Sequence, residues 1–212
     1  MNEILKQFFD FSLIMGKARE LERFKGQFFW EDYPDVKRYE SITDHSWRVA
    51  MLVLLFENKL SQKIDTVKAL KMALIHDLPE VFCGDESPLG KDGTGKNTHA
   101  FNDEKAQQRY QEEKMSAEKL FKMLPDQIGN ELLDLWLEYE KQENFESKVV
   151  KSLDKLEATI SVLEYREGNM FPEHLEFTAS YGTKGSEVDP AIAEFGKIII
   201  EEMKSKYKEF KK

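Results

Sequence analysis

The chain has 212 residues, long enough for one domain with a sizeable hydrophobic core and shorter than chains that usually divide into two. Charged residues make up 33% and hydrophobic residues 41%, which is a globular composition. The formal net charge of -9 and the pI of about 5.1 describe a surface that repels phosphate backbones and anionic lipid. We therefore expect neither a nucleic-acid partner nor a membrane partner.

Helical patterns alternate with turn-rich segments in the first part of the chain. Ser41 and Asp44 have the spacing of a capping box, which starts a helix, and Pro79 disfavours helical conformation in the residue before it. Apolar residues recur at helical spacing between such signals. The glycines and polar residues of SPLGKDGTGKNT predict a loop. The expected helices here cover residues 3–24, 41–60 and 65–78.

Helical patterning continues in the second part of the chain. Pro125 marks a helix start, and the glycines and prolines between Gly168 and Pro190 predict an irregular segment. The lysine-rich end of the last segment suits the negative pole of a helix dipole. The expected helices cover residues 101–123, 125–139, 147–166 and 191–210. Because no convincing strand or internal repeat is present, the sequence predicts an all-α fold in a single domain.

Cys83 is the single cysteine, so no disulfide framework can form, which is typical of a reducing compartment. The N-terminal stretch MNEILKQFFDFSLIMGKARE has no basic region ahead of its apolar residues and does not resemble a signal peptide. No run approaches 18 uninterrupted apolar residues. We predict a cytoplasmic protein without a transmembrane helix.

Polar side chains interrupt the apolar faces of three expected helices. His45 lies in the first turn of one helix, His76 and Asp77 stand together at the end of the next, and Asp154 lies at the edge of a third apolar face. A buried lone carboxylate is costly unless it is paired or coordinates a metal. Two imidazoles and two carboxylates suit Mn²⁺, Co²⁺, Mg²⁺ or Fe²⁺, with Zn²⁺ or Ni²⁺ as further candidates. The competing interpretation is a capping Asp44–His45 pair, an internal His–Asp hydrogen bond and a salt-bridged Asp154.

The order H…HD…D, formed by His45, His76–Asp77 and Asp154, resembles the HD-domain metal-dependent phosphohydrolase superfamily. ESITDHSWRVA is similar to a segment of its small nucleotidases, HDLPEVFCGD to their HD-x-x-E-x-x-x-GD pattern, and LWLEYEKQENFESKVVKSLDKLEA to the segment with the final aspartate. The resemblance is nearest to the 5'-deoxynucleotidase type. It implies an HD-type helical bundle, with residues 1–212 as a single HD domain around a motif-bearing core of about 20–200.

The resemblance implies removal of phosphate from (deoxy)ribonucleoside 5'-monophosphates by water that a divalent cation activates. Glu80 and Asp85 are the implied catalytic residues, and Glu80 would position the water or protonate the leaving group. In close relatives, the positions that match Glu80, Asp85 and Glu86 hold a second metal, and the sequence leaves these roles of Glu80 open. Solvation in a loop is the alternative for Glu80 and Asp85. The implied ligands of the first metal are His45, His76, Asp77 and Asp154.

Trp30 and Arg38 are the candidate substrate-binding residues. The resemblance implies an arginine that holds phosphate and a tryptophan that disfavours a ribose 2'-hydroxyl, both upstream of the first histidine. Trp30 matches that tryptophan only with a one-residue insertion and has no arginine before it, whereas Arg38 matches an arginine nearer to the histidine. Lys25 or Lys37 would also reach phosphate. The preference for deoxyribose stays open, and a plain core position is the alternative for Trp30.

Two other functions stay open. One is an HD hydrolase that acts on nucleoside triphosphates, cyclic dinucleotides or guanosine alarmones, and the other is a non-catalytic HD module that mediates interactions. The intact H, HD and D positions argue against the module. The resemblance also suggests a homodimer, for which the apolar N-terminal helix offers a surface. His99 and His174 lie in polar sequence and are expected at the protein surface.

Overall fold

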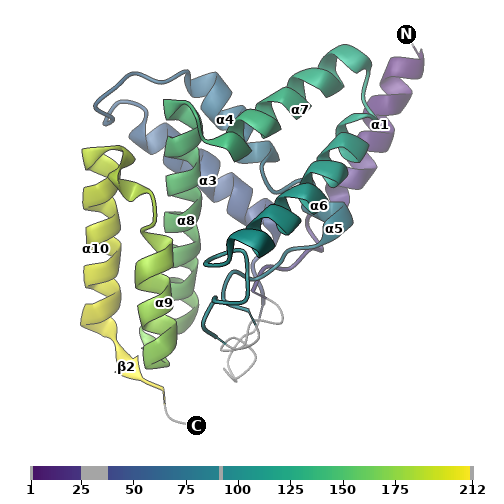
Figure 1. Cartoon of the computed structure of the whole chain (residues 1–212). Helices are drawn as coiled ribbons and strands as arrows, with labels where there is room; N and C mark the ends of the chain where they lie inside the picture. The colour runs from purple at the N-terminus through teal and green to yellow at the C-terminus, as the bar shows by residue number, and fades with distance from the viewer. Residues whose placement is uncertain (1, 25–37, 91–92, 211–212) are drawn as a thin grey trace.

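The structure is a computed structural model that describes residues 2–24, 38–90 and 93–210 (Figure 1). Helices account for almost all of its regular structure, which confirms the all-α prediction. The helices are α1 (Asn2–Lys17), α3 (Ile42–Phe56), α4 (Thr66–Ile75), α5 (Glu80–Cys83), α6 (Asp103–Phe121), α7 (Asp126–Lys141), α8 (Phe145–Arg166), α9 (Pro172–Gly182) and α10 (Pro190–Lys206), with a 3₁₀ turn η1 (Ser186–Val188).

The centre of the fold is a group of three helices, α3, α4 and α8, which pack against one another. Helix α7 packs on α4 and α8, while α9 and α10 cover another side of α8 (Figure 1). Apolar side chains such as Val49, Ala73 and Leu153 are fully buried where these helices meet. Hydrophobic burial therefore fixes the three helices that bear the predicted metal ligands.

The capping box predicted for α3 is present. Ser41 Oγ accepts a hydrogen bond from the Asp44 backbone N–H at 3.2 Å, and Asp44 Oδ2 accepts one from the Ser41 backbone N–H at 3.0 Å. These bonds satisfy amide groups that a helix start leaves without partners. They also fix the first turn of α3, which is the turn that contains His45.

Several helix boundaries differ from the prediction, because apolar spacing fixes helix ends poorly. Pro79 separates α4 from the single-turn α5, so α4 does not continue to residue 78. The expected irregular segment 168–190 is wrong for its middle part, which forms α9 with Pro172 at the first helical position, where its ring suits the helix. Helices α1, α3 and α4 end earlier than predicted, at Lys17, Phe56 and Ile75.

Two short strands, β1 (Asn169–Met170) and β2 (Lys208–Glu209), pair in parallel, where the sequence analysis expects no strand. Segments of two residues show no periodic pattern that would reveal them. The Lys208 N–H donates to the Gly168 carbonyl at 2.8 Å, so the chain leaves helical conformation after Lys206 and not at residue 210. Among the described residues, no helix has the length and apolar character needed to cross a bilayer.

Candidate metal centre

His45 lies in the first turn of α3 and is fully buried. Its Nδ1 atom forms a hydrogen bond with the carboxylate of Glu157 on α8. An ionised carboxylate only accepts hydrogen bonds, so Nδ1 donates the proton. This bond fixes the ring orientation and directs Nε2 toward His76, as second partners of metal-binding histidines do.

His76 is the C-cap residue of α4, and its side chain is buried. Its Nδ1 atom donates to the Ala73 carbonyl at 2.9 Å, and Trp136 Nε1 donates to the His76 carbonyl at 2.9 Å. Nε2 of His76 therefore faces Nε2 of His45, at a distance of 3.2 Å. Two imidazole lone pairs at this distance repel each other unless a proton or a metal cation lies between them.

Asp77 and Asp154 complete this group of side chains. Asp154 Oδ1 lies 3.1 Å from His45 Nε2 and 3.9 Å from His76 Nε2. Asp77 reaches both rings, with Oδ1 3.2 Å from His76 Nε2 and Oδ2 3.5 Å from His45 Nε2. Ligand atoms of His45, His76 and Asp154 all lie within 4.8 Å of one another. The fold thus brings the four predicted ligands together.

The competing interpretation, in which these residues serve only as a helix cap, a His–Asp hydrogen bond and a salt bridge, is partly correct. It does not exclude a metal site. Asp44 does cap α3, and Lys151 Nζ lies 3.8 Å from Asp154 Oδ2. Asp154 Oδ2 also accepts a hydrogen bond from the Tyr139 hydroxyl at 3.0 Å. These partners bind the second oxygen of Asp154 and leave Oδ1 directed at the two imidazoles.

The electrostatics of the centre favour positive charge. Although burial opposes it, the carboxylates of Glu157 and Asp154 raise the pKa of His45 to about 10. Burial also disfavours ionised carboxylates, yet the neighbouring imidazoles hold the pKa of Asp77 and Asp154 below its usual range. The donor set fits a divalent cation, which would replace the proton on His45, because metal ligands bind in their deprotonated forms.

Behind His45 lies a second pair of carboxylates, which the sequence analysis missed. Glu40 and Glu157 are 1% and 0% exposed, and with His45 they form another close group of ligand-type atoms. Arg23 Nη1 lies 3.0 Å from Glu40 and 3.5 Å from Glu157, and Arg48 Nε lies 3.1 Å from Glu157. Because the arginines already neutralise these acids, we interpret this group as the support of His45.

Glu80 begins α5 and is buried one turn beyond Asp77. Its Oε1 accepts a hydrogen bond from Arg109 Nη2 at 3.0 Å, whereas Oε2 is buried without a hydrogen-bond partner among the described residues. Burial and the charges of Asp77 and Asp85 raise the pKa of Glu80 well above its usual value. Oε2 of Glu80 is therefore suited to hold either a proton or a second cation, which are the two roles that the sequence leaves open.

Gly84 turns the chain back toward the metal centre after α5. Its φ of +82° lies in the region that favours glycine, and its carbonyl accepts a hydrogen bond from Arg109 at 2.7 Å. Asp85 and Glu86 follow and line the cavity beside the centre. Burial raises the pKa of Asp85, while Glu86 is exposed. Loop solvation therefore describes Glu86 better than Asp85 or Glu80.

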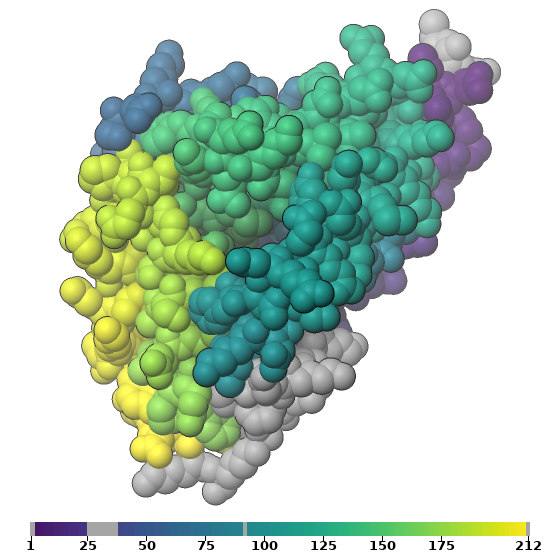
Figure 2. Space-filling view, in the orientation of Figure 1, coloured from purple at the N-terminus to yellow at the C-terminus, as the bar shows by residue number. Residues whose placement is uncertain are grey.

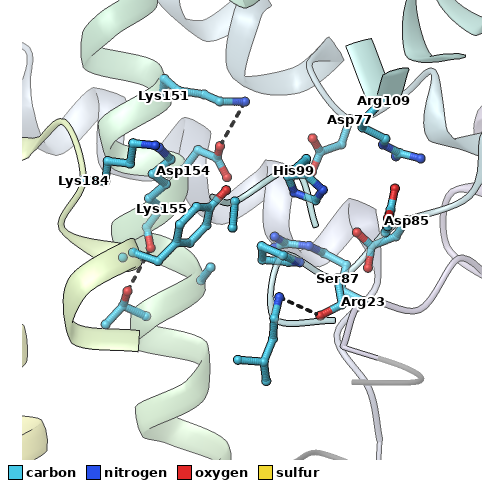
Figure 3. Close-up of a pocket in the computed structure, with 18 of the residues that line it drawn as sticks. Arg23, Asp77, Asp85, Ser87, His99, Arg109, Lys151, Asp154, Lys155 and Lys184 are labelled. Atoms are coloured by element: carbon cyan, nitrogen blue, oxygen red, sulfur yellow. Dashed lines mark hydrogen bonds and ion pairs between the residues drawn. The ribbon is translucent and has the colours of Figure 1, made fainter. Parts of the chain in front are cut away.

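A cavity of about 340 Å³ adjoins the centre, within the range of small-molecule sites. Side chains of α6, α8 and α9 line it, and the space-filling view shows a recess between the teal α6 segment and the yellow-green α9 (Figure 2). In Figure 3, Arg109 and Asp85 lie on one side of the cavity and three lysines lie on the other. These lysines are Lys151, Lys155 and Lys184.

The surface position expected for His99 and His174 is wrong for His174, which is buried, while His99 is half-buried. His99 lines the cavity, and its Nδ1 is buried without a hydrogen-bond partner among the described residues. Burial and the nearby cations, Arg109 first, lower the pKa of His99 to about 4, which leaves it uncharged at neutral pH. His174 lies on α9 and is 2% exposed. Its burial follows from a helix that the sequence analysis does not predict.

The predicted substrate-binding residues lie elsewhere or cannot be placed. Arg38 is exposed, forms an ion pair with Asp44 and is not among the residues that line the cavity. Its guanidinium therefore supports the capping box of α3. The other candidates for substrate binding, Trp30, Lys25 and Lys37, lie outside the described residues.

The comparisons with known proteins agree with this geometry. The family described as HD domain matches residues 25–195. The chain is 33% identical over 173 residues to the 5'-deoxynucleotidase HDDC2 of Xenopus laevis, which covers 82% of this chain and 78% of that protein. It is 31% identical over 168 residues to the 5'-deoxynucleotidase HDDC2 of Dictyostelium discoideum, covering 77% of this chain and 80% of that protein.

A solved structure from Magnetospirillum magnetotacticum, described as a predicted metal-dependent phosphohydrolase, matches with a TM-score of 0.72 at 21% identity. The match covers 96% of this chain and 97% of the other chain. Because the identity is low, it is evidence for a shared fold only. The resemblance drawn from the sequence motifs is confirmed, while the extent of the domain over residues 1–212 stays a prediction. Since the family match spans most of the sequence, the chain belongs to the HD domain family.

Proposed function

We propose that this protein is a metal-dependent phosphohydrolase that removes phosphate from nucleoside 5'-monophosphates, deoxyribonucleotides included. One observation supports this most directly: two buried imidazoles face each other at 3.2 Å, with Asp77 and Asp154 beside them, at the edge of a cavity of about 340 Å³. The names of the relatives, 5'-deoxynucleotidases, support the substrate class.

The native cation in this proposal is Mn²⁺, Co²⁺ or Mg²⁺, with Fe²⁺, Zn²⁺ and Ni²⁺ as alternatives. A bound divalent cation supplies a nucleophilic water and polarises the phosphoryl group. The protein fixes both imidazole Nε2 atoms in place through the Nδ1 bonds to Glu157 and to the Ala73 carbonyl. The proposed ligands are His45, His76, Asp77 and Asp154.

Glu80 is the proposed acid–base residue. Arg109 donates a hydrogen bond to Oε1, and burial and the charge of Asp77 raise the pKa of Glu80 well above its usual value, which favours a proton on Oε2. In this form Glu80 would give its proton to the leaving nucleoside oxygen. The alternative is that Glu80, Asp85 and Glu86 hold a second cation. Metal analysis separates the two, because it counts one or two ions per chain.

The test is phosphate release from a panel of substrates with Mn²⁺, Co²⁺ or Mg²⁺, and with EDTA as the control. We expect release from nucleoside 5'-monophosphates and none with EDTA. Faster turnover of triphosphates, cyclic dinucleotides or guanosine alarmones would favour the other hydrolase function. Inactivity with every metal and substrate would favour the non-catalytic module.

We also propose a homodimer in the cytoplasm. Helix α1 exposes a set of large apolar side chains that a second copy would cover. A Phe9→Glu/Leu13→Glu variant should elute as a monomer in size-exclusion chromatography with light scattering. An Ile198→Glu variant, at an exposed apolar position of α10, is the control. The exposed apolar side chains of α1 are Ile4, Leu5, Phe8, Phe9, Leu13 and Met15.

A further inference from the structure

Three lysines line the cavity on the side across from Arg109 and Asp85 (Figure 3). Lys151 and Lys155 lie on α8, on either side of Asp154 in the sequence, and Lys184 follows the end of α9. We refer to Lys151, Lys155 and Lys184 as the lysine cluster. Its position beside a proposed metal ligand places positive charge next to the reacting centre.

The lysine cluster is only weakly neutralised by the protein. Lys151 has carboxylate oxygens no closer than 3.7 Å, on Glu140, and 3.8 Å, on Asp154. Lys155 places Nζ over the Tyr181 ring, 5.1 Å from its centroid. Within the part of the chain that the structure describes, neither Lys155 nor Lys184 forms an ion pair. Like charges that gather without counterions destabilise a fold, so this arrangement needs a reason.

The arginines of the same cavity show the contrast. Arg23 lies 3.0 Å from Glu40, and Arg109 lies 3.0 Å from Glu80 and also pairs with Glu113. Cations that serve the fold are thus matched with carboxylates of the chain. Among the described residues, Lys155 and Lys184 have no such match, which indicates an anion that comes from outside.

The fold holds the lysine cluster in place through α9. Tyr181, under Lys155, stacks on Phe177 with ring centroids 5.3 Å apart. Gly182 packs so closely on α8 that a Cβ atom there would meet Thr159 Oγ1 at 2.0 Å. This approach draws the end of α9, with Lys184, to the helix that bears Lys155.

We infer that the lysine cluster binds the phosphate of the substrate, and that Lys155 and Lys184 determine specificity for a dianionic phosphate monoester. The inference rests on the proposed function and identifies which side of the cavity receives the phosphate. Ammonium groups bind phosphate as strong charged donors. A phosphate bound between the proposed metal centre and the lysine cluster would direct one oxygen toward the centre, where Asp154 lies. Its other oxygens would face the ammonium groups.

Inorganic phosphate is the probe for the first test, with the full chain loaded with Mn²⁺. The measurement is the melting temperature with and without phosphate, at ionic strength matched with sodium chloride. Phosphate should stabilise the parent and a Lys148→Met control, whose lysine is exposed on the same helix α8. It should not stabilise a Lys155→Met/Lys184→Met variant. A double variant that responds as the parent does would overturn the inference, whatever its own melting temperature.

Kinetics give the second test. Lys155→Met should raise KM for a nucleoside 5'-monophosphate by about tenfold, the factor that a hydrogen bond to a charged group typically contributes. Lys155→Arg should restore most of the lost affinity, because it keeps the charge. A merely structural lysine would instead lower the melting temperature at unchanged KM, and that result would overturn the inference.

The two proposals fail in distinguishable ways. If the parent releases phosphate from no monophosphate, the proposed function is wrong, whereas a phosphate-induced stabilisation that the double variant loses still supports the anion site. If the parent is active and the double variant keeps its KM and its response to phosphate, only the lysine cluster is wrongly assigned.

Discussion

The two sides of the His45 ring differ in how their charges are balanced. On the Nδ1 side, Glu40 and Glu157 are buried acids, and Arg23 and Arg48 pair with them at 3.0 to 3.1 Å. On the Nε2 side, the ring faces another imidazole and two carboxylates, with no arginine among the described ion pairs of those carboxylates. The charges on the Nδ1 side are balanced by the protein itself, whereas those on the Nε2 side call for a bound cation.

This difference teaches how to separate a supporting group from a binding group when both are built from acids and a histidine. Buried charges persist in a fold when they are paired, and an uncompensated cluster is retained when a ligand compensates it. The same criterion distinguishes the paired arginines of the cavity from the lysine cluster. It leads to predictions in which changes on the Nδ1 side mainly lower stability, whereas changes on the Nε2 side mainly lower metal binding and turnover.

The largest effect is expected for Asp77→Ala on the Nε2 side. Loss of this carboxylate should remove bound metal and reduce turnover to background, because a ligand and its negative charge are lost together. Helix content by far-UV circular dichroism should stay close to that of the parent. Metal content after dialysis and phosphate release are the measurements, with Asp134→Ala on the exposed face of α7 as control. Retained metal and turnover would contradict the assignment of Asp77.

Glu80→Gln should reduce turnover by about 10²-fold, the usual contribution of an acid–base group, while the first metal stays bound. Glutamine preserves the shape of the side chain and an oxygen for Arg109, so the loss reports the missing proton. Glu112→Gln, at an exposed position of α6 that does not line the cavity, is the matched control. If Glu80→Gln lowers the metal count from two ions per chain to one, the second-cation role is the correct one.

Glu157→Ala tests the Nδ1 side and should differ from Asp77→Ala by a large loss of stability and a smaller loss of metal binding. The substitution removes the carboxylate that pairs with Arg23 and Arg48. Because breaking a buried ion pair is costly, the free energy of unfolding should fall by about 3 kcal/mol. Metal affinity should fall by about tenfold to a hundredfold, because His45 loses its orienting bond. Urea unfolding and metal titration measure the two effects. Unchanged stability would remove the distinction between the two sides.

His174, which lies on α9 and lines the cavity, gives the smallest expected effect. Burial, followed by the charge of Arg166, lowers its pKa to about 3. Between pH 3 and the unfolded value of about 6.5, the unfolded chain then binds more protons than the folded one, so stability falls as the pH drops below 6.5. From pH 7 to pH 5 the loss should be about 2 kcal/mol.

Urea unfolding at pH 7 and pH 5 in EDTA measures this loss without a contribution from metal release. In His174→Leu the difference between the two pH values should shrink by about the same 2 kcal/mol. An identical pH dependence in the variant and the parent would show that His174 does not titrate as described.

The proposed metal ligands could be located from the sequence because each stands at a position with a local signal. His45 follows a capping box, His76–Asp77 ends an apolar helix before Pro79, and Asp154 lies on an otherwise apolar face. Helix periodicity turns such positions into neighbours once the helices pack. The all-α fold follows from the same periodicity.

The role of Glu157 and the place of His99 at the cavity were not predicted, because both depend on tertiary contacts. Glu157 lies three residues after Asp154 and reads as an ordinary surface acid until α3 brings His45 to it. His99 lies in a polar loop and is half-buried at the cavity, which distant helices line, with only its Nδ1 atom fully buried. A helix-length search for polar residues on apolar faces would have found Glu157, but no local signal identifies His99.

Gly182 has a consequence for laboratory evolution of substrate range. Any side chain at this position collides with Thr159 on α8, so a library that randomises it would consist mainly of misfolded members. Tyr181, the preceding residue, is half-buried, Lys184 is exposed, and both line the cavity. Diversity introduced at these two positions, with residue 182 held as glycine, would therefore reshape the rim of the cavity while the scaffold stays intact.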